Sequence, residues 1–185
     1  MRKLSALALS LALSANAFAL EVGGVDLPEK IEKESKQLTL NGAGVREKFF
    51  MDLYVGSLYL TQKESDAGNI ISDDDLMALR LNIISSLITS EKMTNATIEG
   101  FENATGGNTA PLQAKIDDFL ETFKDEIKEG DSFEMVYVPN EGVKIYKNNQ
   151  HAKTISGLEF KKALFGIWLS DKPAQKSLKK GMLGG

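Results

Sequence analysis

Apolar and polar residues alternate along several stretches of this chain with the two-residue period of β-strands. Residues 38–40 alternate in front of a glycine-rich segment, residues 51–60 alternate with few polar positions on either face, and residues 78–86 alternate apolar with polar positions. We therefore expect residues 51–60 to be covered on both sides and residues 78–86 to be half-buried. The glycine-rich residues 41–45 are expected to form a turn that delivers Arg46 to the next strand.

Two amphipathic helices are expected in the middle of the chain. The first is capped by Thr89 or Ser90 and ends near the glycine pair at residues 106–107. Its apolar side consists of Met93, Ala96, Ile98 and Phe101. The second begins near Pro111 and carries one apolar stripe over residues 112–127, until Gly130 stops it. A stripe of this kind is more typical of a core-facing helix than of a lipid-contacting surface, because every globular helix needs one.

The C-terminal part predicts a meander followed by short helices. Strands are expected over residues 132–138, 143–147 and 151–155. The spacing of Ser156 and Glu159 is that of a capping box, which predicts a helix that carries Leu164, Ile167 and Trp168. A last short helix is expected to start at residues 171–173. Early strands, central helices and a closing meander favour an α+β fold over alternating βαβ units.

The N-terminus predicts a secretory signal. Arg2 and Lys3 precede an apolar run over residues 4–13, and the small residues of the Ala-Phe-Ala sequence at residues 17–19 suit a signal peptidase. A membrane anchor is the alternative, but a span needs about 20 apolar residues and this run is shorter. We expect cleavage after Ala19, no membrane span in the mature protein and export to the periplasm.

Removal of residues 1–19 takes away two basic side chains and no acidic one, which leaves 20 basic against 26 acidic groups and a net charge of −6. No basic patch for nucleic acid stands out. The chain has no cysteine, which excludes disulfides and thiolate catalysis. Residues 20–185 have the length of one domain, and we expect a monomer.

Few residues are available for catalysis or metal binding. The chain has one histidine, His151, in a polar stretch that has no nucleophile-elbow context, so we expect neither a Ser-His-Asp triad nor a zinc site. The two glycines of residues 42–44 lack the third glycine of a dinucleotide fingerprint, which is replaced by Glu47. The acidic residues 73–75 lack the spacing of a calcium loop. We expect no cofactor and no metal.

Two segments resemble the chalcone isomerase-like superfamily. One is residues 41–60, N-G-A-G-V-R-E-K-F-F-M-D-L-Y-V-G-S-L-Y-L, and the other is residues 160–183, F-K-K-A-L-F-G-I-W-L-S-D-K-P-A-Q-K-S-L-K-K-G-M-L. With similar spacing between them, the resemblance covers nearly all of the chain after residue 19. It implies an open-faced β-sandwich, a mainly antiparallel sheet packed against a layer of helices. The superfamily contains isomerases, fatty-acid-binding proteins and helper proteins without catalysis, so it does not fix an activity.

The resemblance singles out Arg46 and Tyr54. From the residues alone, Arg46 suits a surface ion pair with Glu47 or Asp52, and Tyr54 suits a strand aromatic at the sheet margin. In the superfamily, the position of Arg46 is that of an arginine that faces the ligand. Tyr54 matches a position where isomerases carry a threonine and fatty-acid binders carry a tyrosine. The helix tyrosine and asparagine of the isomerases find no clear counterpart in residues 91–95.

The function that uses both residues is non-catalytic binding of a small apolar anion, such as a fatty acid or a flavonoid-like molecule, with Arg46 and Tyr54 on the anionic group. The first alternative is a chalcone-flavanone isomerase-type intramolecular lyase, in which Arg46 stabilises the reacting phenolate. The second is a helper protein that has no ligand and binds a protein partner.

Overall fold

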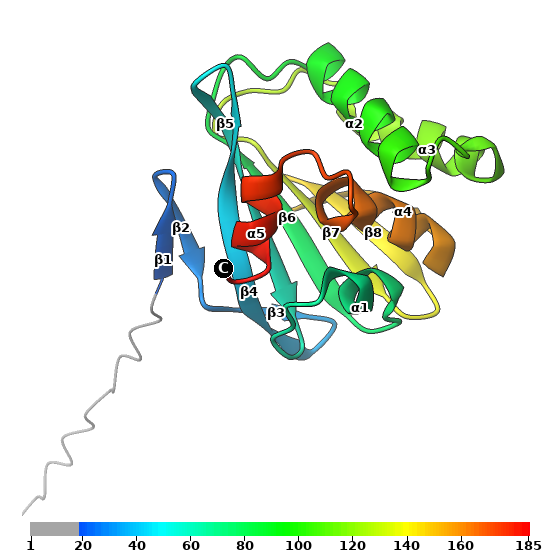
Figure 1. Ribbon diagram of the computed structural model, residues 1–185, viewed down its shortest axis with the longest axis horizontal. Coiled ribbons are helices and arrows are strands. Elements are labelled where there is room, and N and C mark those ends of the chain that lie inside the picture. Colours follow the sequence, from blue (N-terminus) through cyan, green and yellow to red (C-terminus); the bar gives the residue numbers. More distant parts are fainter. Residues whose placement is uncertain (1–18) are drawn as a thin grey trace, which may run out of the picture.

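The sheet is an antiparallel meander of seven strands that follow one another in sequence order. The computed structural model describes residues 19–185. The strands are β3 (Lys30–Lys33), β4 (Lys36–Lys48), β5 (Met51–Leu60), β6 (Met77–Ile83), β7 (Ser132–Val138), β8 (Gly142–Lys147) and β9 (Gln150–Ile155). A separate hairpin is formed by β1 (Ala19–Val22) and β2 (Val25–Pro28), and it lies beside β4 and β5 (Figure 1).

The sheet curls strongly enough for its first strand to reach its fifth. Glu134 on β7 is buried, and its carboxylate accepts hydrogen bonds from Lys33 on β3 and, at 2.6 Å, from Arg80 on β6. Three strands separate β3 from β7 in the order of the sheet, so the contact between Lys33 and Glu134 requires the strand twist to accumulate across them.

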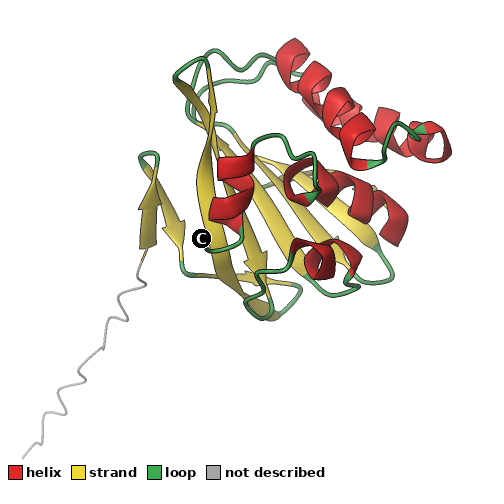
Figure 2. Cartoon of the chain, in the orientation of Figure 1, coloured by secondary structure: helices red, strands yellow, loops and turns green. Residues whose placement is uncertain are grey.

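The helices gather over one face of this sheet (Figures 1 and 2). They are α1 (Ala67–Ser72), α2 (Ser90–Ala104), α3 (Gln113–Leu120), α4 (Leu158–Leu169) and α5 (Lys176–Met182), with the short 3₁₀ turns η1 (Ala110–Leu112) and η2 (Glu121–Phe123). An antiparallel sheet with helices on one side confirms the predicted α+β class and the open-faced sandwich. Among residues 19–185, no helix combines the length and the hydropathy that crossing a membrane requires.

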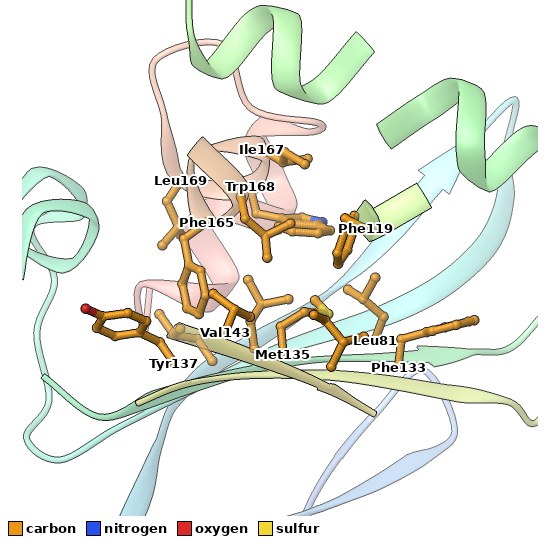
Figure 3. Packing of buried hydrophobic residues seen from close by; sticks show 14 of the residues in the cluster. Leu81, Phe119, Phe133, Met135, Tyr137, Val143, Phe165, Ile167, Trp168 and Leu169 are labelled. Atoms are coloured by element: carbon orange, nitrogen blue, oxygen red, sulfur yellow. The ribbon is translucent and has the colours of Figure 1, made fainter. Parts of the chain in front are cut away.

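Apolar side chains cover both faces of the central strands. On the helix side, Phe165 and Trp168 of α4 lie over Leu81, Met135 and Val143 of the sheet (Figure 3). A second cluster lies on the other face and joins Leu27 of the β1–β2 hairpin to Val55 and Tyr59 of β5 and their neighbours. Strand β5 has the predicted bounds, and it is buried from Tyr54 to Leu60, so the expectation that it is covered on both sides is confirmed.

The glycine-rich segment is not a turn, and that prediction is wrong. Residues 41–46 continue strand β4, which runs for 13 residues with an irregularity between Leu40 and Gly42. The glycines are needed because helix α5 packs directly on the strand backbone. An added Cβ at Gly42 would overlap the carbonyl oxygen of Gly181, and one at Gly181 would overlap the carbonyl oxygen of Ala43.

The middle helices also depart from the prediction. The second helix does not continue to Gly130, since α3 ends at Leu120 and passes into the 3₁₀ turn η2, where the hydroxyls of Thr122 and Ser90 donate to the carbonyl oxygens of Phe119 and Phe123. Ile127 therefore lies in a loop, although its side chain is buried in the core.

In α2 the buried residues are Met93, Thr97, Gly100 and Phe101. Ile98 is 38% exposed, because Gly100 lets Ile167 of α4 approach this helix on another side.

The two C-terminal helices begin elsewhere than predicted. Helix α4 has Gly157 at its N-cap with φ of 106° and no side-chain cap, so the capping box is absent, and Glu159 pairs with Lys162 instead. Only a residue that tolerates positive φ fits this N-cap. Helix α5 begins at Lys176 rather than at residues 171–173, because the backbone N–H of Ala174 donates back to Ile167 at 2.8 Å and holds the linker in a turn.

We predict that Gly42→Ala weakens the docking of α5 on β4. The new methyl group would meet backbone atoms, which cannot rotate away, so the free energy of unfolding should fall by about 1–3 kcal/mol in chemical denaturation. Gly44→Ala is the matched control. It lies on the same face of β4, but its Cβ would meet Leu178 at 3.3–3.4 Å, so a smaller loss is expected. Equal losses in the two variants would contradict this account of the glycines.

Candidate functional site

Arg46 lies near the end of β4, directly opposite Tyr54 of β5 in the antiparallel register. Residues paired in this way place their side chains on the same face of the sheet, about 4.5–5.5 Å apart at Cβ. Tyr54 belongs to the cluster on the helix side, so Arg46 also faces the helix layer. The structure thus brings together the two residues that the sequence singled out.

Gln175, in the linker between α4 and α5, is the main partner of Arg46. The guanidinium Nη1 donates to the Gln175 side-chain oxygen Oε1 at 2.9 Å, and the backbone N–H of Glu47 donates to the same oxygen at 2.8 Å. The side-chain nitrogen of Gln175 donates to the hydroxyl of Ser177 at 2.7 Å, which keeps the amide oxygen turned toward Arg46. The Oε1 atom of Gln175 therefore accepts hydrogen bonds from two N–H donors at once.

No carboxylate neutralises Arg46 among the ion pairs of residues 19–185. Its remaining hydrogen bond goes to the carbonyl oxygen of Glu47, not to the carboxylate of that residue. The surface ion pair with Glu47 or Asp52, which the residues alone suggested, is therefore wrong. The half-buried guanidinium is thus bound only by neutral oxygens, and its hydrogen bonds would be stronger with a negatively charged acceptor.

Tyr54 is buried, and its hydroxyl oxygen accepts a hydrogen bond from the indole Nε1 of Trp168 at 3.0 Å. Burial raises the pKa of Tyr54 above its ordinary value, while the hydrogen bond from Trp168 and the nearby charge of Arg46 act in the opposite direction. The phenol is thus neutral at physiological pH. Since Trp168 uses an acceptor position of the hydroxyl, the proton of Tyr54 can be donated to a further acceptor.

The space beside Arg46 and Tyr54 is closed by the C-terminal helices. Leu178 and Met182 of α5 are buried against the strand backbone at Gly44 and Gly56, and Trp168 of α4 lies on Tyr54. An open cavity of about 640 Å³ lies elsewhere, between the end of β5 and the loop that follows α1. Glu64 and the three aspartates of residues 73–75 line that cavity, so it is unsuited to a carboxylate ligand.

Sequence reasoning missed three contributors to this site. They are Gln175, the backbone N–H of Glu47, and the indole of Trp168, which was expected only as a core residue. No local pattern marks Gln175, because its partner lies 129 residues away in the chain.

His151 is exposed on β9 and bonds to Thr154. Within residues 19–185, no group of three or more potential metal-ligating side chains comes together.

The comparisons with known proteins agree with the fold. A family model described as chalcone isomerase-like matches residues 19–184. A solved structure of a fatty-acid binding protein from Arabidopsis thaliana, AtFAP1, superposes with a TM-score of 0.69 at 17% identity, over 86% of this chain and 92% of the other. A search of curated proteins finds no match. The resemblance noted in the sequence is thereby confirmed.

We predict that Tyr54→Phe destabilises the protein even without ligand. The change leaves the buried N–H of Trp168 without an acceptor, which should lower the free energy of unfolding by about 1–3 kcal/mol. Trp168 is the only tryptophan of the chain, so its emission can follow the unfolding and report the altered surroundings of the indole. The control is Tyr146→Phe, at a half-buried strand tyrosine, where less than about 0.5 kcal/mol is expected. Equal effects of the two changes would argue against the bond between Trp168 and Tyr54.

Proposed function

Because the chain belongs to the chalcone isomerase-like family, we propose that it is a non-catalytic binding protein that holds a fatty acid or a similar apolar carboxylate through Arg46 and Tyr54. The observation that carries this proposal is the Gln175 side-chain oxygen, which accepts from both Arg46 and the backbone N–H of Glu47. A carboxylate oxygen has the same acceptor chemistry and adds a negative charge. The fatty-acid binding protein of the same fold supports this class of ligand.

In the proposed complex, the ligand carboxylate takes the place of Gln175. One carboxylate oxygen accepts from Arg46 and from the backbone N–H of Glu47, and the other accepts from the hydroxyl of Tyr54. Tyr54 stays bonded to Trp168 as an acceptor while it donates its proton to the ligand. The exchange favours the ligand, because a charged acceptor forms stronger hydrogen bonds with a guanidinium than a neutral amide does.

The alkyl chain requires space that the closed structure fills with side chains. Gln175 belongs to the linker between α4 and α5, so its displacement frees this linker and the neighbouring Leu178 from the strand. We propose that the alkyl chain of the ligand enters between α5 and the sheet, where the surroundings are apolar. Each CH₂ group that leaves water contributes about 0.8 kcal/mol, so a long tail offsets the lost packing.

We predict a graded loss of fatty-acid affinity across three variants. Arg46→Ala removes a charge-assisted pair and should cost about 1.5–3 kcal/mol, whereas Tyr54→Phe removes one hydrogen bond and should cost about 0.5–1.5 kcal/mol. Arg46→Lys should restore only part of the loss, because an ammonium group lacks the planar fork of a guanidinium. The emission of Trp168 and calorimetry, at temperatures where all variants are folded, provide the measurement. Unchanged affinity in Arg46→Ala would refute the proposal.

Gln175→Ala distinguishes displacement of the amide from simple surface binding. Removal of the internal competitor should strengthen fatty-acid binding severalfold, since the ligand no longer displaces a hydrogen-bonded amide. Gln150→Ala, at an exposed glutamine on β9, is the matched control and should leave the affinity unchanged. Incubation of the same samples with a 2′-hydroxychalcone tests the isomerase alternative. Stereoselective cyclisation that is lost in Arg46→Ala would favour the enzyme over the binding protein.

We also propose that the protein acts in the periplasm. The support is the signal-like sequence of residues 1–19, of which residues 1–18 lie outside the described part of the structure. The expected outcome is a mature protein that begins at Leu20, because the Ala-Phe-Ala sequence precedes it. Intact mass spectrometry of protein recovered from the cell envelope checks this. Recovery of the chain with Met1 retained would contradict export with cleavage.

A further inference from the structure

The tip of the β4–β5 hairpin has an unusual composition. Lys48 and Met51 form the last pair of the ladder, and Phe49 and Phe50 alone make the turn between them. Both phenylalanines have positive φ, 53° and 64°, as a type I′ turn requires. Side chains with a Cβ pay a steric cost of about 1–2 kcal/mol in this left-handed region, and bulky residues rarely occupy it.

Another hairpin turn of the same chain has the residue types that are usual for this backbone conformation. The β8–β9 turn is made by Asn148 and Asn149, with φ of 51° and 64°, and asparagine is among the residues that tolerate this conformation best. The β4–β5 turn needs the same backbone but carries two large aromatic residues. A backbone outlier of this kind points to a function of the side chains that offsets the strain.

Phe49 and Phe50 are also the most exposed large apolar side chains among residues 19–185. Phe49 is 78% exposed, Phe50 is fully exposed at 107%, and the adjacent Met51 is 43% exposed. In the fold these residues form the turn at one end of the two-stranded β4–β5 ribbon (Figure 1). Other exposed large apolar residues, such as Leu20 and Ile98, are single residues on other elements.

We propose that this tip, residues 48–51, docks the protein on a lipid bilayer by inserting the two phenylalanine rings among the lipid chains. A narrow convex tip suits a bilayer, which deforms around it. A stable contact with a second copy or another protein would need about 1,000 Å² or more of complementary surface, and two adjacent side chains on a ribbon end provide far less. The two-residue turn also introduces few unpaired backbone groups into the membrane.

The charges around the tip indicate apolar insertion rather than electrostatic attraction. The Lys48 ammonium lies 5.6 Å from the centre of the Phe49 ring, where it can reach the lipid phosphates while the ring enters the membrane. Glu47 and Asp52 flank the tip on the two strands, so residues 47–52 together carry no excess of positive charge. Binding should therefore depend on buried apolar area and depend little on salt.

Insertion of the tip also orients the candidate site toward the lipid. Arg46 lies on β4, three residues before Phe49 of the turn, which corresponds to about 10 Å along the ribbon. The site would then lie at the level of the lipid head groups, where an apolar carboxylate can pass between bilayer and protein. The docking extends the proposed function without depending on it, because the phenylalanines have no part in holding the carboxylate.

The test is sedimentation of the protein with phosphatidylcholine vesicles, without fatty acid, after purification from cells that express the whole chain. The decisive variant carries Phe49→Asn with Phe50→Gly, which is the favoured type I′ sequence. Relief of the strain should raise its melting temperature by about 2–4 °C, while loss of the rings should weaken vesicle binding by about tenfold or more. Ile98→Ser, at another exposed apolar residue, should bind vesicles as the wild type does.

The proposal would be overturned by no vesicle binding by the wild type, by undiminished binding by the Asn-Gly variant, or by binding that high salt abolishes. A wild-type dimer that is lost in the Asn-Gly variant in analytical ultracentrifugation would assign the tip to a second copy of the chain instead. Fatty-acid affinity of the Asn-Gly variant should equal that of the wild type. Failure of the fatty-acid titration would remove the proposed function alone, since vesicle binding is measured without that ligand.

Discussion

Direct backbone contact between helix α5 and strand β4 is the constraint on which the arrangement of the C-terminal half depends. Glycine at positions 42 and 181 removes the side chains that would keep helix and strand apart. The close contact fixes the linker before α5, and this linker carries Gln175 to Arg46. It also limits where α4 can lie, and α4 brings Trp168 to Tyr54. The glycines near Arg46 therefore shape the site by admitting a helix, not by forming a ligand-binding loop.

The site is closed by groups that imitate part of its proposed ligand. An amide oxygen fills a position with two N–H donors, but it brings no charge to the guanidinium. Such an arrangement keeps the polar groups satisfied, and it is compatible with the proposed exchange of the amide for an anion. Displacement of the amide breaks two hydrogen bonds, one from the charged guanidinium and one from the backbone N–H of Glu47, and the second of these contributes about 0.5–1.5 kcal/mol. The proposed ligand would therefore contact the same atoms that now bind Gln175.

The β4–β5 ribbon combines three different physical demands along its length. Near Gly42 and Gly56 it accepts a helix at close range, at Arg46 and Tyr54 it presents hydrogen-bond donors, and at its tip it holds two aromatic residues in a strained turn. Long antiparallel pairing makes this possible, because the ladder fixes the register of all three regions at once. The strain at the tip is tolerated since the paired strands below it hold the turn.

The sequence by itself determined the α+β class, the bounds of β5, the β7–β8 hairpin and the start of α2, because these follow from local periodicity and from capping or turn residues. It also singled out Arg46 and Tyr54 through a family resemblance. Only the tertiary structure decided what the glycines are for, where the second middle helix ends and which groups meet Arg46 and Tyr54. Those outcomes depend on contacts between residues as far as 114 and 129 positions apart, and local patterns carry no information about such pairs.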